Sequence, residues 1–213
     1  MRDKRTASEK EEPNMSSQAI EAIMELPVSV PDMKPGPWNV DTAHSSLEFT
    51  AKHMVFTTVH GRFDEFDATV VVDPEPSKSH VEVTIKADSI STGNPDRDTH
   101  LKSPDFLDVE SYPELTFKST ALDDINPEAG TFTLKGEFTV LDQTVPIALD
   151  VEFNGLMDKD LWGNPRASFT ATGSFSRKDW GLTWNKALET GGFLVSDKVN
   201  INIEIALVRK AGE

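Results

Sequence analysis

The feature that most constrains this sequence is an alternation of apolar and polar residues that recurs along the chain after Trp38. In HVEVTIKAD, residues 80–88, and in VNINIEIAL, residues 199–207, almost every second residue is apolar. A period of two places successive side chains on opposite faces of a β-strand. About eight stretches of this kind follow one another. The sequence therefore predicts an all-β domain in which each strand has one apolar and one polar face.

Amphipathic strands joined by short turns are typical of an antiparallel sheet closed into a barrel, or of a two-sheet sandwich. Closure leaves no unpaired sheet edge, so we expect an antiparallel β-barrel of about eight strands. Residues 93–108, GNPDRDTHLKSPDFLD, depart from the alternation and predict a short helical insert, since Pro95 suits a first helical turn. The alternation changes phase between Phe63 and Phe66, which indicates a β-bulge.

The first 37 residues differ from the rest of the chain. They mix charges without periodicity, with an acidic excess, and end in the proline-rich run PVSVPDMKPGP. Such a composition favours an extended or disordered segment. We therefore expect a disordered leader at 1–37 and a barrel domain at 38–213.

Charge and composition exclude several classes of function. The formal net charge is −15 at pH 7, which argues against binding to a nucleic-acid phosphate backbone and against electrostatic attachment to anionic membrane. The chain has no cysteine, which excludes disulfides, thiol nucleophiles and cysteine-ligated metals. No apolar run approaches the roughly 18 residues of a membrane span, and no apolar signal-peptide core follows the N-terminal basic residues. We expect a cytoplasmic protein.

Three of the five histidines lie close together in the sequence, at His44, His53 and His60, but their spacing fits no metal-binding pattern. Asp41, His44 and Ser45 resemble the members of a catalytic triad. However, they lie on local chain at a strand junction, without a nucleophile elbow or an oxyanion hole. We predict neither a catalytic nor a metal site, and expect Asp41 and His44 to brace the junction through hydrogen bonds.

A series of separated motifs, in order and with matching spacing, resembles the YceI-like family of lipocalin-like polyisoprenoid-binding proteins. The resemblance covers about Trp38 to Arg209. The motifs are Trp38-Asn-Val-Asp41, His44-Ser45, Lys52-His53-Met54, Gly61-Arg-Phe63, Asp98-Thr-His100-Leu101, Ser103-Pro-Asp105-Phe106, Tyr112-Pro113 with Phe117, Lys135-Gly-Glu-Phe-Thr139, Arg177-Lys-Asp179-Trp-Gly181 and Val195-Ser-Asp197-Lys-Val199.

The resemblance implies an extended lipocalin-type barrel that holds a long apolar ligand and is not an enzyme. Family ligands are isoprenoid-type lipids such as polyprenyl chains, isoprenoid quinones and fatty amides. The expected partner is therefore a long-chain apolar small molecule, with no required cofactor beyond that bound lipid. Family members can form dimers, so a homodimer remains open. Many members carry a secretion signal, which this sequence does not show.

An eight-stranded barrel is just wide enough to fill with side chains or to hold one slender ligand. Small residues on the apolar faces, namely Ala51, Ala68, Ala87, Ala171, Gly136 and Gly173, favour open space along the axis, although a tapered solid core uses small residues too. The predicted tunnel lining comprises Leu47, Phe49, Ala51, His53, Phe63, Phe66, Val83, Ile85, Phe106, Phe117, Phe132, Leu134, Phe138, Ile147, Leu149, Phe169, Phe175, Ile201 and Ile203.

Several assignments stay open. His53 shares the inward phase of its strand and could donate to a ligand oxygen at the tunnel mouth, or be a hydrogen-bonded core histidine. Trp162, Trp180 and Trp184 could form an aromatic rim or plug the barrel end. Two other functions compete with lipid binding: an enzyme acting on a small apolar substrate in the same cavity, and a solid-core interaction or stress protein whose acidic exterior recognises a basic partner.

Overall fold

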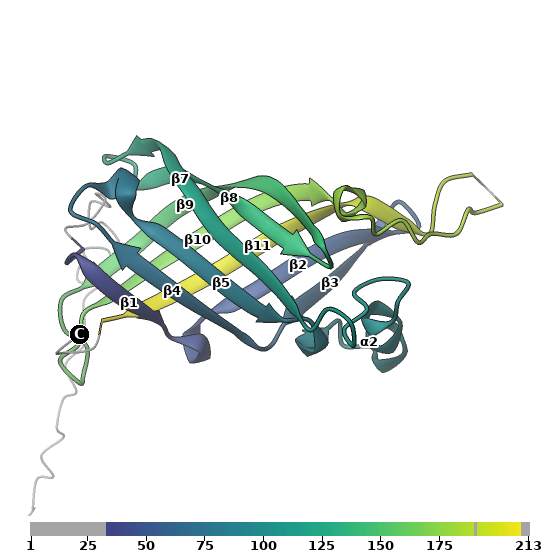
Figure 1. Cartoon of the computed structure of the whole chain (residues 1–213), viewed down its shortest axis with the longest axis horizontal. Coiled ribbons are helices and arrows are strands. Elements are labelled where there is room, and N and C mark those ends of the chain that lie inside the picture. The colour runs from purple at the N-terminus through teal and green to yellow at the C-terminus, as the bar shows by residue number, and fades with distance from the viewer. Residues whose placement is uncertain (1–32, 190, 210–213) are drawn as a thin grey trace, which may run out of the picture.

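The computed structural model describes residues 33–189 and 191–209, and these form one twisted, elongated barrel (Figure 1). Its strands are β1 (Gly36–Val40), β2 (Ser46–His53), β3 (Thr57–Phe63), β4 (Phe66–Val72), β5 (His80–Lys86), β6 (Ile90–Ser91), β7 (Glu114–Asn126), β8 (Thr131–Val140), β9 (Gln143–Met157), β10 (Arg166–Ser176) and β11 (Val195–Val208). The helix α2 (Pro95–Lys102) and four short 3₁₀ turns, η1 (Thr42–His44), η2 (Pro76–Lys78), η3 (Ala87–Ser89) and η4 (Arg177–Trp180), complete the described elements.

All strand pairs are antiparallel, and the sheet closes on itself. Strands β7 to β11 pair in sequence order, and β1 closes the ring by pairing with β11 on one side and β4 on the other. The register at the closure places Asn39 opposite both Val208 and Thr69. The predicted antiparallel barrel of about eight strands with a helical insert is confirmed, because the closed ring has eight strands.

Three strands of the ring are interrupted, and the interruptions lie side by side. β1 and β2 follow one another along β11, separated by η1, while β5 and β6 are separated by η3. The third interruption lies between β3 and β4, at Asp64 and Glu65. These residues hydrogen-bond to the segment between β5 and β6 and to the end of β5: Asp64 N donates to Ser89 O at 3.2 Å, and Lys86 N donates to Glu65 O at 2.9 Å. The predicted irregularity between Phe63 and Phe66 lies at this interruption, where β3 pairs with β2 and β6, and β4 pairs with β1 and β5.

The helical insert forms where its capping residues predict it. The Asn94 side chain accepts a hydrogen bond from Arg97 N at 3.0 Å, and Pro95 occupies the first turn, where its missing N–H is not needed. The Asp98 carboxylate accepts from Thr92 N at 2.8 Å, which ties the helix to the preceding chain. Among the described residues, no helix is long and apolar enough to cross a membrane.

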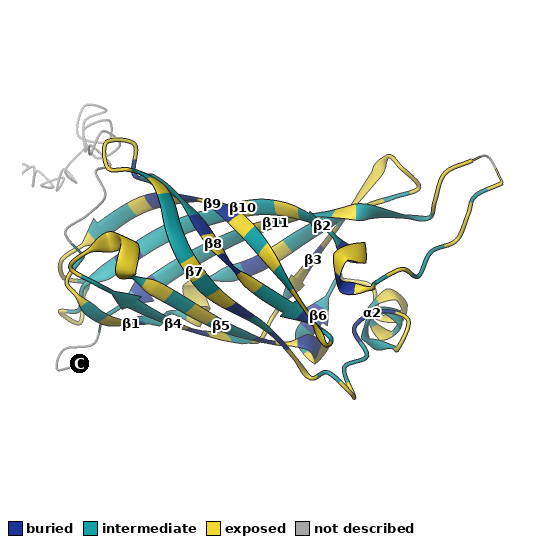
Figure 2. Ribbon diagram, turned by 45° about the horizontal axis from the view of Figure 1, so that its top comes forward, coloured by how far each residue is buried: buried dark blue, intermediate teal, exposed yellow. Residues whose placement is uncertain are grey.

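The barrel has two ends that differ in construction, and we name them for what lies there. The terminal end contains β1, the end of β11 and the 158–165 loop between β9 and β10. The helix end contains α2, the β2–β3 turn and the 181–194 connection, which projects beyond the strands (Figure 1). Buried residues occupy the inner faces of the strands between the two ends, whereas the connections are mostly exposed (Figure 2).

A compact cap closes the terminal end. Its buried members are Trp38, Phe153, Ala167 and Leu207, with Trp38 only 1% exposed. Trp38 Nε1 donates to Lys34 O at 3.0 Å, and Met33 packs against the cap. The barrel therefore begins before the predicted boundary at residue 38. Residues 1–32 lie outside the described residues, so the disordered leader stays a prediction.

Candidate ligand-binding cavity

The barrel encloses a cavity of about 280 Å³ that is partly open to solvent. All ring strands except β1 contribute side chains to its lining, joined by β2, β3 and β6, and almost no polar atom faces the interior. The four buried cap residues, Trp38, Phe153, Ala167 and Leu207, do not contribute to its lining, whereas Val70 and Ile205, which pack against them, do, so the cavity ends at the cap. At the helix end the lining includes residues of the connections. The interior is thus a blind apolar space that reaches the helix end.

The structure places most of the predicted tunnel residues around this cavity. They come from alternate positions of β2, β3, β5, β7, β8, β9, β10 and β11, as a strand period of two requires, with Phe106 added from the segment after α2. Whether they bind a ligand stays a prediction. They are Leu47, Phe49, Ala51, Phe63, Val83, Ile85, Phe106, Phe117, Leu134, Phe138, Ile147, Leu149, Phe175, Ile201 and Ile203.

Four predicted lining residues lie elsewhere. Phe132 and Phe169 contact each other, with ring centroids 6.4 Å apart, and Phe169 packs against the terminal cap beyond the cavity. Phe66 faces inward opposite Ile85 but packs against the core cluster beside the strand breaks. His53, at the last position of β2, is half-buried and outside the lining. Strand alternation assigned these four residues to the inner face, and they do not contribute to the lining of this cavity.

The small inward residues have different effects. Ala51, Ala68 and Ala171 line the cavity and leave room there. At Gly136 a Cβ would overlap the Phe117 ring, and the same holds at Gly61 for the Phe49 ring. The glycines therefore let these two rings lie flat across the neighbouring strand as part of the cavity wall. Ala87 is buried in the core cluster.

Several lining residues were not in the predicted set. Alternation placed some of them on inward faces: Ala68, Val70, Val81, Leu115, Val140, Ala171, Val199 and Ile205. Others come from irregular connections or strand ends, where no period exists to identify them. These are Ile90, Leu101, Leu107, Leu182, Val195 and Arg177, whereas Glu48 lies within β2 on its polar face.

Arg177, in η4, is a buried cation at the edge of the cavity, with 5% of its surface exposed. Nε donates to Ser196 O at 3.1 Å, Nη1 donates to Leu182 O, and Nη2 donates to Asp197 Oδ1 at 3.3 Å. Burial lowers the pKa of Arg177, and the Asp197 carboxylate opposes that shift. The guanidinium thus holds the start of the 181–194 connection against β11. Only the aliphatic part of the Arg177 side chain is available to the cavity.

The three tryptophans proposed as a rim have three different environments. Trp180 is 1% exposed, packs on Phe138 and Phe175, and donates from Nε1 to Phe138 O at 2.8 Å. It is a core residue, not a rim residue. Trp162 is 75% exposed but lies at the terminal end, away from the helix-end lining. Trp184 is half-buried and lies at the helix end.

Trp184 joins an aromatic cluster across the helix end. Its ring centroid lies 4.6 Å from that of His100 and 5.2 Å from that of Phe106, and His100 lies 5.0 Å from Phe106. His100 is held by Asp105, with Nε2 and Oδ2 2.9 Å apart. Phe106 also lines the cavity. These edge-on contacts connect α2 to the 181–194 connection, and we call the three rings the helix-end trio.

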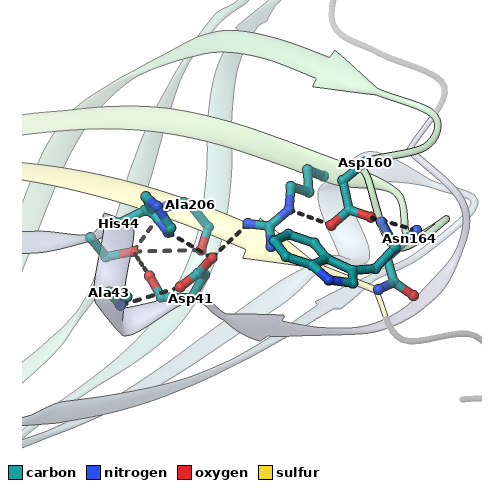
Figure 3. Close-up of polar contacts among 9 residues, drawn as sticks. Asp41, Ala43, His44, Asp160, Asn164 and Ala206 are labelled. Atoms are coloured by element: carbon teal, nitrogen blue, oxygen red, sulfur yellow. Dashed lines mark hydrogen bonds and ion pairs between the residues drawn. The ribbon is translucent and has the colours of Figure 1, made fainter.

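Asp41 and His44 belong to an ionic clamp at the terminal end (Figure 3). Asp41 Oδ2 lies 2.9 Å from His44 Nδ1 and accepts from Arg166 Nη1 at 2.5 Å, while Arg166 Nε donates to Asp160 Oδ2 at 2.7 Å. The Arg166 guanidinium lies 5.8 Å from the Trp162 ring. The predicted bracing role for Asp41 and His44 agrees with these contacts.

The clamp perturbs its acids and does not form a triad. The Arg166 guanidinium lowers the pKa of Asp41 and of Asp160, and burial partly opposes both shifts. The same two carboxylates raise the pKa of Arg166. Ser45 Oγ donates to Asp41 O and accepts from Ala206 N, so its hydroxyl is engaged with backbone.

A model of the YceI-like domain matches residues 38–207. Among curated relatives, a UPF0312 protein of Staphylococcus aureus (strain N315) is 38% identical over 160 residues, covering 75% of this chain and 90% of that protein. A UPF0312 protein of Pectobacterium atrosepticum is 37% identical over 141 residues, covering 66% of this chain and 71% of that protein.

Solved structures show the same fold. The Campylobacter jejuni YCEI protein matches with a TM-score of 0.64 and 29% identity, covering 75% of this chain and 90% of that one. Burkholderia cenocepacia BcnA matches with a TM-score of 0.67 and 21% identity (78% and 98% covered), and a polyisoprenoid binding domain from Saccharophagus degradans with 0.57 and 14% (83% and 100%). The match over residues 38–207 and the curated relatives together show that this chain belongs to the YceI-like family.

Proposed function

We propose that this protein is a non-enzymatic lipid-binding barrel that holds one slender apolar chain, of isoprenoid type, in the cavity. The observation that carries this proposal is the cavity itself, about 280 Å³ of space with an apolar lining inside a closed ring. This volume lies just below the range for small-molecule sites, roughly 300–1,000 Å³. A narrow chain fits such a space better than a ring system does.

The chemical class of the ligand follows from the lining. Burying a methylene-sized group contributes about 0.8 kcal/mol, and ordering the flexible chain offsets part of this gain. With almost no polar atom facing the interior, the lining offers nothing to recognise a head group. We therefore expect affinity to depend on the length and width of the apolar chain. The Saccharophagus degradans domain described as polyisoprenoid binding shares the fold and supports an isoprenoid as the first ligand to try.

The polar groups at the cavity favour binding over catalysis. Among the lining residues the ionisable ones are Glu48 and Arg177, and the Arg177 guanidinium is occupied by Ser196 O, Leu182 O and Asp197. A catalytic group needs hydrogen-bond reach to the reacting atoms. His53, the strongest sequence candidate for such a role, lies outside the lining.

The test is uptake of fatty-chain and polyprenyl probes of increasing length by the purified protein, without vesicles, combined with native mass spectrometry and lipid extraction. We expect a bound mass that extraction releases, and thermal stabilisation that grows with probe length, because a ligand that binds only the native state raises its stability. A protein that carries no lipid and takes up no probe would overturn the proposal.

A matched pair of variants locates the binding in the barrel. Ala171 lines the cavity, whereas its neighbour Thr172 is exposed on the outer face of the same strand. Ala171→Phe should lower probe affinity about tenfold or more by filling the cavity, and Thr172→Phe should leave it unchanged. Ala68→Leu, on the opposite wall, repeats the test if Ala171→Phe folds poorly. Equal effects of the inner and outer variants would place the probe elsewhere.

A further inference from the structure

Exposed apolar side chains gather on two connections at the helix end. In the β2–β3 turn, Phe56 is 76% exposed, Val55 is 68% exposed and Met54 is 39% exposed. In the 181–194 connection, Phe193 is 57% exposed. We call these four residues the apolar tip. A contiguous exposed patch of large apolar side chains marks an interaction surface more often than an isolated one does.

The two connections form one unit beside the cavity. Met54 N donates to Leu194 O at 2.9 Å, and a Cβ at Gly192 would lie 3.5 Å from Val55 Cγ2. The 181–194 connection also supplies Leu182 to the cavity lining, and Val195 follows it directly at the start of β11. The apolar tip is therefore continuous with the part of the barrel where the cavity reaches the connections.

The β2–β3 turn does not need the apolar side chains of Met54 and Val55 in order to form. Met54 has φ of 49° and Val55 has φ of 75°, both in the left-handed region. Tight hairpin turns with such backbones favour asparagine and glycine, and a β-branched residue there is a conformational outlier. Apolar residues thus occupy positions where they strain the backbone and expose their side chains to water.

We propose that the apolar tip docks on a lipid bilayer, inserting its side chains into the interfacial region beside the cavity. Its size fits this partner better than a protein. Taking about 200 Å² for a phenylalanine and less for valine and methionine, the four side chains expose roughly 400 Å². A stable protein interface buries about 800 Å² on each partner. The tip consists of two projecting connections, a shape that suits insertion into a soft interface (Figure 1).

The charges around the tip agree with a bilayer surface. Lys52 and Lys186 are exposed nearby in sequence, and residues 52–58 contain no acid, in a chain of net charge −15. Lys178 Nζ lies 6.0 Å from the Phe193 ring but is paired with Asp197 Oδ2 at 2.8 Å, and Glu189 is exposed on the 181–194 connection, so Lys52 and Lys186 are the basic groups open to a head group. Basic residues beside inserted apolar ones favour anionic head groups. The acidic remainder of the barrel limits attraction to the bilayer, which keeps the docking reversible.

The terminal end provides an internal control. Leu161 is 95% exposed and Trp162 is 75% exposed, so a second apolar pair lies at the opposite end of the barrel. That pair adjoins the closed cap, and Asp158 and Asp160 flank it. If exposure of apolar side chains alone caused docking, both ends would bind vesicles.

The experiment is flotation of the full chain with phosphatidylcholine vesicles, with and without phosphatidylglycerol. We expect the double variant Phe56→Ser with Phe193→Ser to bind about tenfold or more weakly, through loss of inserted apolar area, and Leu161→Ser with Trp162→Ser to bind like the original. Binding to phosphatidylcholine alone should persist at high salt. Thermal unfolding confirms that both variants fold.

Three outcomes would overturn the proposal: no flotation of the original chain, equal loss in the two double variants, or self-association through the tip, seen as a concentration-dependent mass that Phe56→Ser with Phe193→Ser abolishes. The inference rests on the proposed lipid cargo for its biological sense, but the two fail separately. Probe uptake without vesicles tests the cavity, and the tip variant should retain it because neither residue lines the cavity.

Discussion

The two ends of the barrel are closed in different ways. At the terminal end, strand residues form a buried cap around Trp38, and a clamp centred on Arg166 ties the chain directly after β1 to β10 and to the 158–165 loop that precedes β10. At the helix end, closure depends on connections: the helix-end trio links α2 to the 181–194 connection through half-exposed rings. The terminal end is held by strand ladders, and the helix end by side-chain contacts between segments with few ladder bonds.

This difference indicates where the barrel can open. Local opening has the lowest free energy where few buried apolar contacts and few protected backbone bonds must break. Opening the terminal cap requires exposure of Trp38 and Leu207, both almost fully buried. Opening the helix end requires separation of the trio and of the side-chain contacts that hold the 181–194 connection, such as the Arg177 bonds to Leu182 O and Ser196 O, with the strands left in place. The comparison predicts that ligand exchange occurs at the helix end.

The largest expected effect is at the terminal cap. Trp38→Ala should lower the free energy of unfolding by about 3–5 kcal/mol, because it leaves a cavity in a closed cluster and removes the bond to Lys34 O. Urea unfolding measures the loss. A cost below that of an exposed substitution such as Thr172→Ala would show that the cap does not hold this end.

The clamp should give a smaller and pH-dependent effect. Asp41 and Asp160 have folded-state pKa values below the usual 3.8, so their contribution to stability is present above about pH 4 and is lost as pH falls through the folded values. Arg166→Met should therefore destabilise the protein more at pH 7 than at pH 3, where the carboxyls of the unfolded chain are largely protonated. Urea unfolding of both proteins at the two pH values tests this, and an equal difference at both would contradict it.

At the helix end, Trp184→Ala should cost about 1 kcal/mol or less, since it removes one edge-on and one tilted ring contact from a half-exposed site. Its main effect should be kinetic: stopped-flow fluorescence should show faster probe entry and release, with little change in affinity. Trp162→Ala, at the other end, is the matched control and should leave both rates unchanged. If Trp162→Ala sped up exchange and Trp184→Ala did not, the site of ligand exchange would be the terminal end.

The smallest effect concerns the β2–β3 turn. Val55→Gly removes a side chain from the left-handed region, which relieves about 1–2 kcal/mol, while the greater freedom of glycine in the unfolded chain offsets about half of that. We expect a net gain of about 0.5 kcal/mol in thermal or urea unfolding. A loss of stability would mean that Val55 has a structural role, and the case for docking would weaken.

Much of the fold is predictable because alternation specifies which face of a strand turns inward. Phe49, Ile85 and Ile203 were assigned to the cavity on that basis, and they line it. Alternation does not specify height along the barrel, so Phe132 and Phe169 were assigned to the tunnel but lie outside the cavity lining, and Phe169 packs against the cap. Height depends on strand tilt and stagger, which arise from pairing between strands distant in sequence.

The rest of the site comes from segments without a period. Leu107 and Leu182 line the cavity from connections whose course depends on packing. The break between Phe63 and Phe66 was visible as a phase change, but the change of partners across it was not, because the phase of one strand contains no information about its neighbours. The three tryptophans were grouped by residue type, whereas their separation between the two ends depends on topology.

The blind shape of the cavity has a consequence for the orientation of any cargo. A tube with a single opening admits a lipid only by its narrow tail and releases it by the same route. The apolar wall cannot accept a head group, so that group must stay at the opening, beside α2 and the 181–194 connection. Every protein molecule with a bound lipid would then hold it in the same orientation, with the head group outward, where an enzyme or a second carrier can reach it.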